Sequence, residues 1–246
     1  MPTLSIDTAT EVLALALGEG EKILAKSSID AGRSHLELLL PGVQQLLDEA
    51  GLTVRDIDGI VAGTGPGTFS GLRVGIATAR ALAQTLEVRL SGSSTLEALA
   101  FGLAEETSAS QLLLPVIDAK RSQVFAQLFK KEGKNTVKPE SEVLCLDPQA
   151  LLAELAKITG AAVRAAGNGV LAYRDIFGNA EQLELPGPDR PENRVDAGWH
   201  LRAGLAETET GSDFDPGLLL SVVPHYVREP DADKTILLRK KEPWLQ

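Results

Sequence analysis

The residues with the clearest chemical meaning form one glycine-rich run, GTGPGTFSGLRVG, from Gly63 to Gly75. An apolar segment at 57–61 precedes this run, and a helical pattern at 72–86 follows it. A strand, a glycine-rich turn and a helix start in this order bring backbone N–H groups and the positive end of a helix dipole to one point. Such a point suits either an anion or the close approach of another backbone, and the sequence leaves both readings open.

Familiar phosphate-binding and nucleophile motifs do not fit this run. A P-loop ends in Gly-Lys-Ser/Thr, and the run contains no lysine. A dinucleotide-binding fingerprint needs a third glycine where Thr68 stands. A nucleophile elbow centred on Ser70 needs glycines at positions 68 and 72, where threonine and leucine stand. The structural alternative is a turn whose glycines permit tight packing of the strand against the helix.

Two segments, 4–17 and 115–129, repeat one pattern. Each is an apolar strand that ends in Ile-Asp, followed by a short polar turn and a second strand. Asp7 and Asp118 take the same place in the two copies, and the second turn is one residue longer. The repeat predicts two related lobes whose hairpins turn these carboxylates toward a shared cleft. Two unrelated hairpins would give a similar pattern, because Ile-Asp at a strand end is common.

Apolar spacing predicts two helices between these hairpins, at 34–50 and 72–86. The second helix is apolar or small on most of its faces, which is typical of a helix that is central to a core or covered by another molecule. Further helices are predicted at 148–157, capped by Asp147, and at 196–207. Strands alternate with these helices, so the chain is predicted to have an α/β fold.

The bulk composition narrows the function further. The chain has 246 residues and a formal net charge of −10, which argues against broad independent binding to nucleic acid. Cys145 is the only cysteine, so neither an intrachain disulfide nor a cysteine-based zinc site can form. The N-terminus lacks the pattern of a signal peptide, and no uncharged apolar stretch approaches bilayer length. We expect a soluble, cytoplasmic protein without membrane contact.

These features together resemble the bacterial TsaB (YeaZ) family, the non-catalytic paralogue in biosynthesis of N6-threonylcarbamoyladenosine in tRNA. The resemblance extends over nearly the whole chain, and the glycine-rich run followed by Leu-Arg-Val-Gly is its most specific part. The other matching segments are IDTAT at 6–10, LLP at 39–41, SSTLEALA at 93–100, IDAKR at 117–121, GNG at 167–169 and PHYVR at 224–228.

The resemblance implies a fold of the actin-like ATPase and sugar-kinase superfamily, with two ribonuclease H-like lobes of which the second is reduced. The expected parts are an N-terminal lobe at 1–106, a reduced second lobe at 107–195, and a C-terminal helix and tail at 196–246 that packs back on the first lobe.

In active members of that superfamily, the two hairpins and a later glycine pair hold a nucleotide. Similar places in this chain form a vestigial nucleotide cleft at Asp7, Thr8, Asp118, Gly167 and Gly169. The resemblance implies that no cofactor is needed, and weak binding of ATP or ADP is left open.

The catalytic relative carries a metal-binding His-x-Glu-Ala-His segment after the same glycine loop and helix. Here the corresponding residues 95–99 read TLEAL, so both imidazoles are replaced. A metal site of this kind needs two imidazoles one helical turn apart. The remaining histidines, His35, His200 and His225, do not have this spacing. We therefore expect no metal and no catalytic residue in this chain.

The resemblance implies a scaffold or activator required for the threonylcarbamoyl group on the adenosine beside the anticodon, in tRNAs that read codons beginning with adenine. The implied partners are the catalytic threonylcarbamoyl-transferase subunit and an ATPase subunit, with a homodimer when the partner is absent and tRNA reached only through the complex. The expected interface consists of Leu36, Leu39, Leu40, Val43, Leu72, Arg73, Ile76, Ala79, Arg80 and Ala83.

Two alternatives of another class stay open at this point. The chain could act alone as an ATP-binding kinase or hydrolase of the actin-like superfamily, with Asp7 and Asp118 in the cleft. It could also be a stand-alone peptidase, although the missing histidines count against this function.

Overall fold

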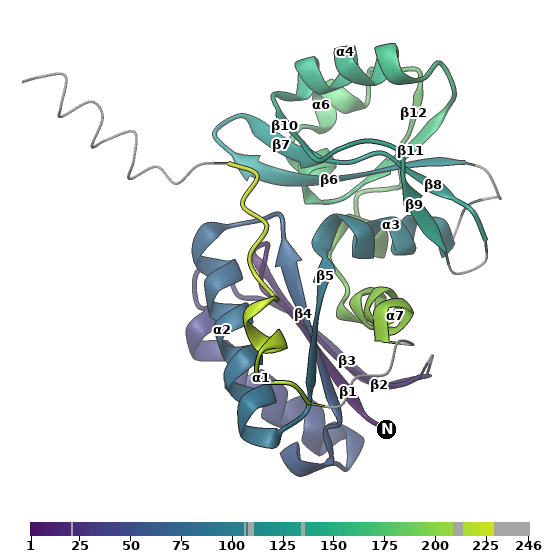
Figure 1. Ribbon diagram of the computed structural model, residues 1–246. Helices are drawn as coiled ribbons and strands as arrows, with labels where there is room; N and C mark the ends of the chain where they lie inside the picture. Colours follow the sequence, from purple (N-terminus) through teal and green to yellow (C-terminus); the bar gives the residue numbers. More distant parts are fainter. Residues whose placement is uncertain (21, 106, 108–110, 134–135, 209–213, 229–246) are drawn as a thin grey trace, which may run out of the picture.

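The computed structural model describes residues 1–20, 22–105, 107, 111–133, 136–208 and 214–228. Two β-sheets lie above one another, with helices on their outer faces and between them (Figure 1). The helices α3 (Thr95–Glu105) and α7 (Ala197–Thr208) fill the space between the two sheets (Figure 1). No helix within the described ranges is both long and apolar enough to cross a membrane.

The first sheet has the strand order β3-β2-β1-β4-β5. β1 pairs antiparallel with β2 and parallel with β4, which in turn pairs parallel with β5. The helices α1 and α2 cover one face, and α7 packs against the other. The elements of this part are β1 (Thr3–Asp7), β2 (Val12–Glu19), β3 (Lys22–Asp30), α1 (His35–Ala50), the 3-10 helix η1 (Val54–Asp56), β4 (Gly59–Gly65), α2 (Phe69–Leu86) and β5 (Arg89–Ser94).

The second sheet has the main strand order β10-β7-β6-β11-β12, and β8 joins β6 to β9. The helices α4 and α6 lie on its outer face, and α3 lies on the inner face (Figure 1). Its elements are β6 (Leu112–Lys120), β7 (Gln123–Ala126), β8 (Phe129–Lys131), β9 (Val137–Pro139), β10 (Leu144–Leu146), α4 (Pro148–Ile158), β11 (Val163–Ala166), α5 (Asn168–Ala172), α6 (Arg174–Phe177) and β12 (Leu183–Glu184), followed by the 3-10 helix η2 (Pro191–Asn193). The 3-10 helix η3 (Leu218–Leu220) comes after α7 and packs against α2 of the first sheet.

The alternation of side chains along β2 explains why the first sheet has two different faces. Leu13, Leu15 and Leu17 pack under α1 and α2, whereas Ala14 and Ala16 face α3 and α7. Successive residues of a strand point to opposite faces, so this sequence places large side chains on one side and small ones on the other. The small side chains leave room for two central helices that both sheets share.

Both predicted hairpins are confirmed. β1 and β2 pair with Asp7 opposite Ala14, and β6 and β7 pair with Asp118 opposite Val124. The predicted α/β class is therefore confirmed as well. The lobe limits at 106 and 195 stay predictions, because α3 and α7 belong to a core that residues of both sheets line.

Candidate functional site

The glycine-rich run packs against the turn of the first hairpin. A Cβ atom at Gly67 would overlap the carbonyl oxygen of Ala9, and one at Gly71 would overlap that of Thr8. The backbone N–H of Thr68 donates to the same Ala9 oxygen at 2.7 Å. Of the two readings that the sequence left open, these contacts favour close approach of another backbone, because the hairpin turn already occupies the surface of the run.

Asp7 lies inside the protein instead of in an open cleft, which corrects its expected position. Its side chain has no exposed surface. The backbone N–H of Ala9 donates to Oδ1 at 2.7 Å, and the Thr95 hydroxyl donates to Oδ2 at 2.8 Å. His200 Nε2 lies 2.9 Å from the same Oδ2, and its Nδ1 lies 3.0 Å from Ser93 Oγ. This network joins β1, β5, α3 and α7.

The protonation of Asp7 follows from these neighbours. Burial raises the pKa of this carboxyl, but the nearby His200 and the hydrogen bonds from Ala9 and Thr95 act in the other direction. The net result is a pKa below the ordinary value of 3.8. Asp7 is therefore ionised at neutral pH although it is fully buried.

Ser93, His200 and Asp7 are the residue types of a hydrolase triad, but this group is not open to a substrate. Asp7 and His200 have no exposed surface, and Ser93 is 4% exposed. A triad serine must reach a substrate carbonyl, and a buried serine cannot do so. The group therefore does not meet the geometric requirement for acyl transfer. The arrangement instead connects α7 and α3 to the first hairpin.

The other residues expected in a nucleotide cleft also have structural contacts. Thr8 is buried, and its hydroxyl donates to the carbonyl of Gly71 at 2.7 Å. Gly167 has φ of 123°, and a Cβ there would overlap the carbonyl of Val116 on β6. A Cβ at Gly169 would likewise crowd β6. These three residues therefore take part in packing, and their place in a vestigial nucleotide cleft stays a prediction.

Asp118 takes part in a contact between the two hairpins through Lys120. Its backbone N–H donates to Asn168 Oδ1 at 3.0 Å, and Asp118 Oδ2 lies 3.0 Å from the Lys120 ammonium. The same ammonium lies 2.8 Å from Glu11 Oε1 on the first hairpin turn. Hydrogen bonds to Glu11 and Asp118 raise the pKa of Lys120. The two hairpins are thus joined by one lysine.

A cavity of about 140 Å³ lies between the lobes beside this lysine bridge. Its polar lining includes Glu11, Asp30, Asn168 and Arg194. Arg194 is already paired with Asp30 at 3.0 Å. Two carboxylates and one neutralised arginine form poor surroundings for a polyphosphate, because like charges repel.

The segment that replaces the relative's metal-binding histidines is also part of the core. Thr95 donates its hydroxyl to Asp7, and Leu99 is 1% exposed. His35 is buried at the start of α1, and His225 is exposed beyond η3. Within the described ranges, no three His, Cys, Asp or Glu side chains are grouped so that they could hold a metal ion.

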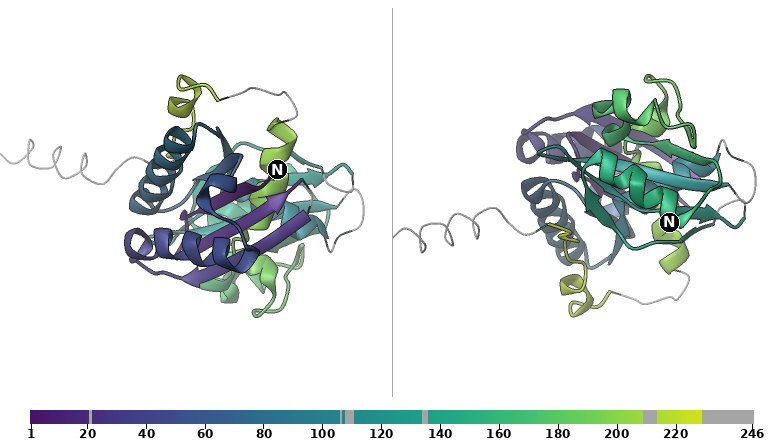
Figure 2. Two further views of the ribbon diagram at one scale, coloured as in Figure 1. Left: turned by 90° about the horizontal axis from the view of Figure 1, so that it is seen from below. Right: turned by 90° about the horizontal axis from the view of Figure 1, so that it is seen from above.

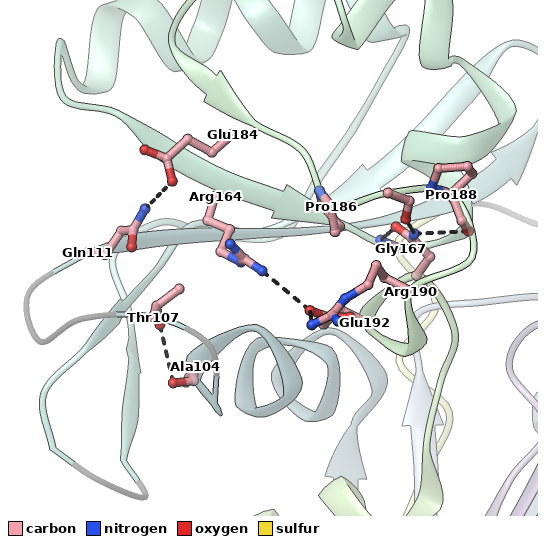
Figure 3. A network of polar contacts seen from close by, with 12 residues as sticks. Ala104, Thr107, Gln111, Arg164, Gly167, Glu184, Pro186, Pro188, Arg190 and Glu192 are labelled. Atoms are coloured by element: carbon pink, nitrogen blue, oxygen red, sulfur yellow. Dashed lines mark hydrogen bonds and ion pairs between the residues drawn. The ribbon is translucent and has the colours of Figure 1, made fainter.

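Residues 185–194 are rich in proline, glycine and charge, a composition typical of a solvated linker, but the structure buries the carboxylate of Glu192 in this segment. Figure 3 shows Arg164 and Arg190 converging on Glu192, each with a guanidinium nitrogen 3.3 Å from Oε1. Burial raises the pKa of Glu192, but hydrogen bonds from its own backbone and from Arg190 bring the pKa below its usual value. Asn193 holds the same segment by donating to the Gly187 carbonyl at 2.8 Å. Alternating charge and proline in the sequence do not distinguish such an anchored segment from a solvated one.

Burial divides the ten residues of the expected partner interface into two groups. Six are covered by the chain's own core, so their expected place on the surface is corrected: Leu39, Val43, Leu72, Ile76, Ala79 and Ala83. Leu36 and Leu40 are 74% and 56% exposed on α1. Arg73 is exposed and Arg80 half-buried on α2. An amphipathic helix turns one stripe toward its sheet, and the six buried residues belong to these stripes on α1 and α2.

The two arginines contact residues 214–228, which we call the C-terminal strap. Arg73 Nε donates to the Tyr226 hydroxyl at 3.0 Å, and Arg80 donates to the carbonyl of Val222. The backbone N–H of His225 donates to the carbonyl of Thr64 on β4 at 2.8 Å. The strap therefore lies beside α2, on the side opposite α1 (Figure 2).

The two lobes, each led by an antiparallel hairpin whose first strand also has a parallel neighbour, have the mixed α/β fold expected of the actin-like ATPase and sugar-kinase superfamily. A family model described as "TsaD: tRNA N6-adenosine threonylcarbamoyltransferase" matches residues 27–178. The Escherichia coli "tRNA threonylcarbamoyladenosine biosynthesis protein TsaB" is 31% identical over 72% of this chain and 75% of that protein. The chain belongs to the TsaB/YeaZ family.

Two further relatives cover most of the chain. An uncharacterized protein of Mycobacterium tuberculosis is 31% identical over 93% of this chain and 92% of its own length. The solved structure of YeaZ from Pseudomonas aeruginosa superposes with a TM-score of 0.71 at 23% identity, over 92% of this chain and 99% of that one. The fold thus extends over both lobes.

Proposed function

We propose that this chain is a non-catalytic scaffold and activator in the formation of N6-threonylcarbamoyladenosine on tRNA. The reaction places a threonylcarbamoyl group on the adenosine beside the anticodon, in tRNAs that read codons beginning with adenine. Family membership and the match to a threonylcarbamoyltransferase model support this assignment.

One observation carries the non-catalytic part of the proposal. The positions that resemble the catalytic relative's metal-binding histidines hold Thr95 and Leu99, and both side chains are buried. The Thr95 hydroxyl donates a hydrogen bond to Asp7, and Leu99 lies in the core that the two sheets share. The chain thus retains a related framework in which this segment has become part of the packing.

The partner in this proposal is the catalytic threonylcarbamoyl-transferase subunit, and an ATPase subunit joins the assembly. The contact surface is the solvent face of α1 and α2, where Leu36 and Leu40 lie one helical turn apart and exposed. Covering each leucine would contribute about 1.5–3 kcal/mol at most. The same face forms a homodimer when the partner is absent. Two paired helices from each subunit can pack as a bundle.

No resident cofactor belongs to this proposal, and tRNA is reached only through the complex. The burial of Asp7 and Thr8 and the lysine bridge between the hairpins support the first point. The net charge of −10 supports the second, because tRNA binding relies on basic surface.

Reconstituted modification of tRNA tests the proposal. The catalytic and ATPase subunits would be assayed for threonylcarbamoyladenosine with and without this chain, and the chain would be assayed alone. We expect no product from the chain alone and a rate with all subunits at least about tenfold above that without it. Product formed by the isolated chain would overturn the non-catalytic assignment.

The surface is tested with Leu36→Glu and Leu40→Glu. A charge buried against an apolar partner without a counter-ion is strongly unfavourable, so both variants should lose partner binding and activation. Ile158→Glu is the matched control, because Ile158 is 44% exposed on α4 in the other lobe. Unchanged affinity of both α1 variants would place the interface elsewhere.

A further inference from the structure

The C-terminal strap carries an unusual share of the exposed apolar surface. Among the described residues, ten large apolar side chains are exposed, and five of them lie on the strap or in contact with it. These five are Phe69 on α2 and Leu218, Leu220, Val223 and Tyr226 on the strap. Scattered single side chains of this kind need no explanation, but several that gather on one segment and on the helix beside it are typical of an interaction surface.

Three of the side chains at the end of this strip are held in one fixed cluster. The rings of Phe69 and Tyr226 stack with centroids 5.0 Å apart and an interplanar angle of 28°. The guanidinium of Arg73 lies 3.9 Å from the centre of the Phe69 ring and donates to the Tyr226 hydroxyl. Tyrosine and arginine are among the residue types that dominate binding energy at interfaces. Side chains fixed before binding lose little entropy when a partner covers them.

The strap continues the helical face to which the proposed function assigns the partner. Figure 2 shows α1, α2 and the strap side by side along one edge of the molecule. Arg73 and Arg80 bind the strap directly to α2, so a protein body that covers α2 also meets the strap. A stable interface needs roughly 20–30 residues from each side. The solvent faces of two helices of 16 and 18 residues supply fewer than that.

We propose that the strap is the second half of the partner-binding face, with the Phe69–Arg73–Tyr226 cluster as its anchor and the catalytic subunit as its occupant. This inference rests on the proposed function, because it extends the surface assigned there. Arg73 and Arg80 are cationic groups on a chain whose formal net charge is −10, and we expect acidic side chains on the partner surface opposite them.

The test measures the affinity of the full chain for the catalytic subunit by isothermal titration calorimetry. Tyr226→Ala removes the stack and the hydrogen bond, and we expect binding at least about tenfold weaker. Tyr226→Phe keeps the stacked ring and should bind within about threefold of wild type. Ile158→Ala on α4 is the matched control for loss of an exposed apolar side chain, with affinity unchanged.

Leu220→Ser is a second test variant, needed because Tyr226→Ala could weaken binding by disturbing the conformation of the strap. Leu220 is 71% exposed, so this variant leaves the folded chain intact and should weaken binding about threefold or more. Affinity within twofold of wild type for both Tyr226→Ala and Leu220→Ser would overturn the inference. Weakened self-association with unchanged partner affinity would assign the strap to a second copy of the chain and would overturn it as well.

The α1 variants separate the two proposals. If Leu36→Glu loses binding while Tyr226→Ala and Leu220→Ser bind fully, the proposed function stands. Only the assignment of the strap to the partner-binding face is then wrong. If all of these variants bind fully, the assignment of the solvent face of α1 and α2 as the contact surface is wrong as well.

Discussion

Asp7 on β1 and His200 on α7 meet at 2.9 Å in the interior, and neither side chain has any exposed surface. They stand 193 positions apart in the sequence, so their contact joins β1 to α7. Since α7 lies in the core between the sheets, this one contact helps to fix how the shared core closes.

Removing the charge of Asp7 should therefore destabilise the protein. Asp7→Asn leaves the imidazole of His200 and the Ala9 N–H without a carboxylate, and breaking a buried pair costs roughly 3–5 kcal/mol. We expect a loss of this order in the free energy of unfolding, measured with urea. Glu11→Gln is the control, because Glu11 belongs to an exposed pair worth less than about 1 kcal/mol. Equal free energies of unfolding for the two variants would mean that the buried Asp7–His200 contact contributes no more to stability than the exposed pair.

Acid should weaken the same contact. The pKa of Asp7 is lower in the folded protein than its ordinary 3.8, so its contribution is fully present above that value and is lost as pH falls through the folded-state pKa. The stability difference between wild type and Asp7→Asn should therefore shrink below about pH 4. Thermal unfolding at several pH values measures this difference. A difference that grows on acidification would contradict the assignment of an ionised Asp7.

The glycine-rich run should tolerate no side chain where it meets the first hairpin. Gly67→Ala places a Cβ against the backbone of Ala9, and overpacking of this kind typically costs about 1–3 kcal/mol. Gly160→Ala is the matched control, because a Cβ at Gly160 has no neighbour within 4 Å. Urea unfolding of both variants decides the matter, and a neutral Gly67→Ala would show that the hairpin can move away from the run.

The lysine bridge between the lobes should contribute little to stability. Lys120→Met breaks two ion pairs, but the Lys120 side chain is 48% exposed, so solvent screens them. We expect a change below about 1 kcal/mol in the free energy of unfolding, decreasing further at high salt. A loss of several kcal/mol that salt does not reduce would instead identify Lys120 as a structural tie between the lobes.

Local patterns in the sequence determined most of the elements. The apolar spacing predicted α1 at 34–50, and the structure has His35–Ala50. Asp147 was predicted to cap α4, and its Oδ1 accepts hydrogen bonds from the N–H groups of Gln149 and Ala150. Such features depend on residues a few positions apart, so a single sequence contains all the information that they need.

The tertiary structure alone decided what these elements do. Leu39 and Leu40 are adjacent in one helix, but only the position of the sheet makes Leu39 buried and Leu40 exposed. The sequence left Gly67 and Gly71 open to an anion or to a backbone, and the hairpin turn around Ala9 settled that choice by occupying the space. Asp7 looked like a cleft residue until α7 brought His200 to it. Burial and pairing between distant positions depend on how the layers stack, and no periodicity in the chain encodes that directly.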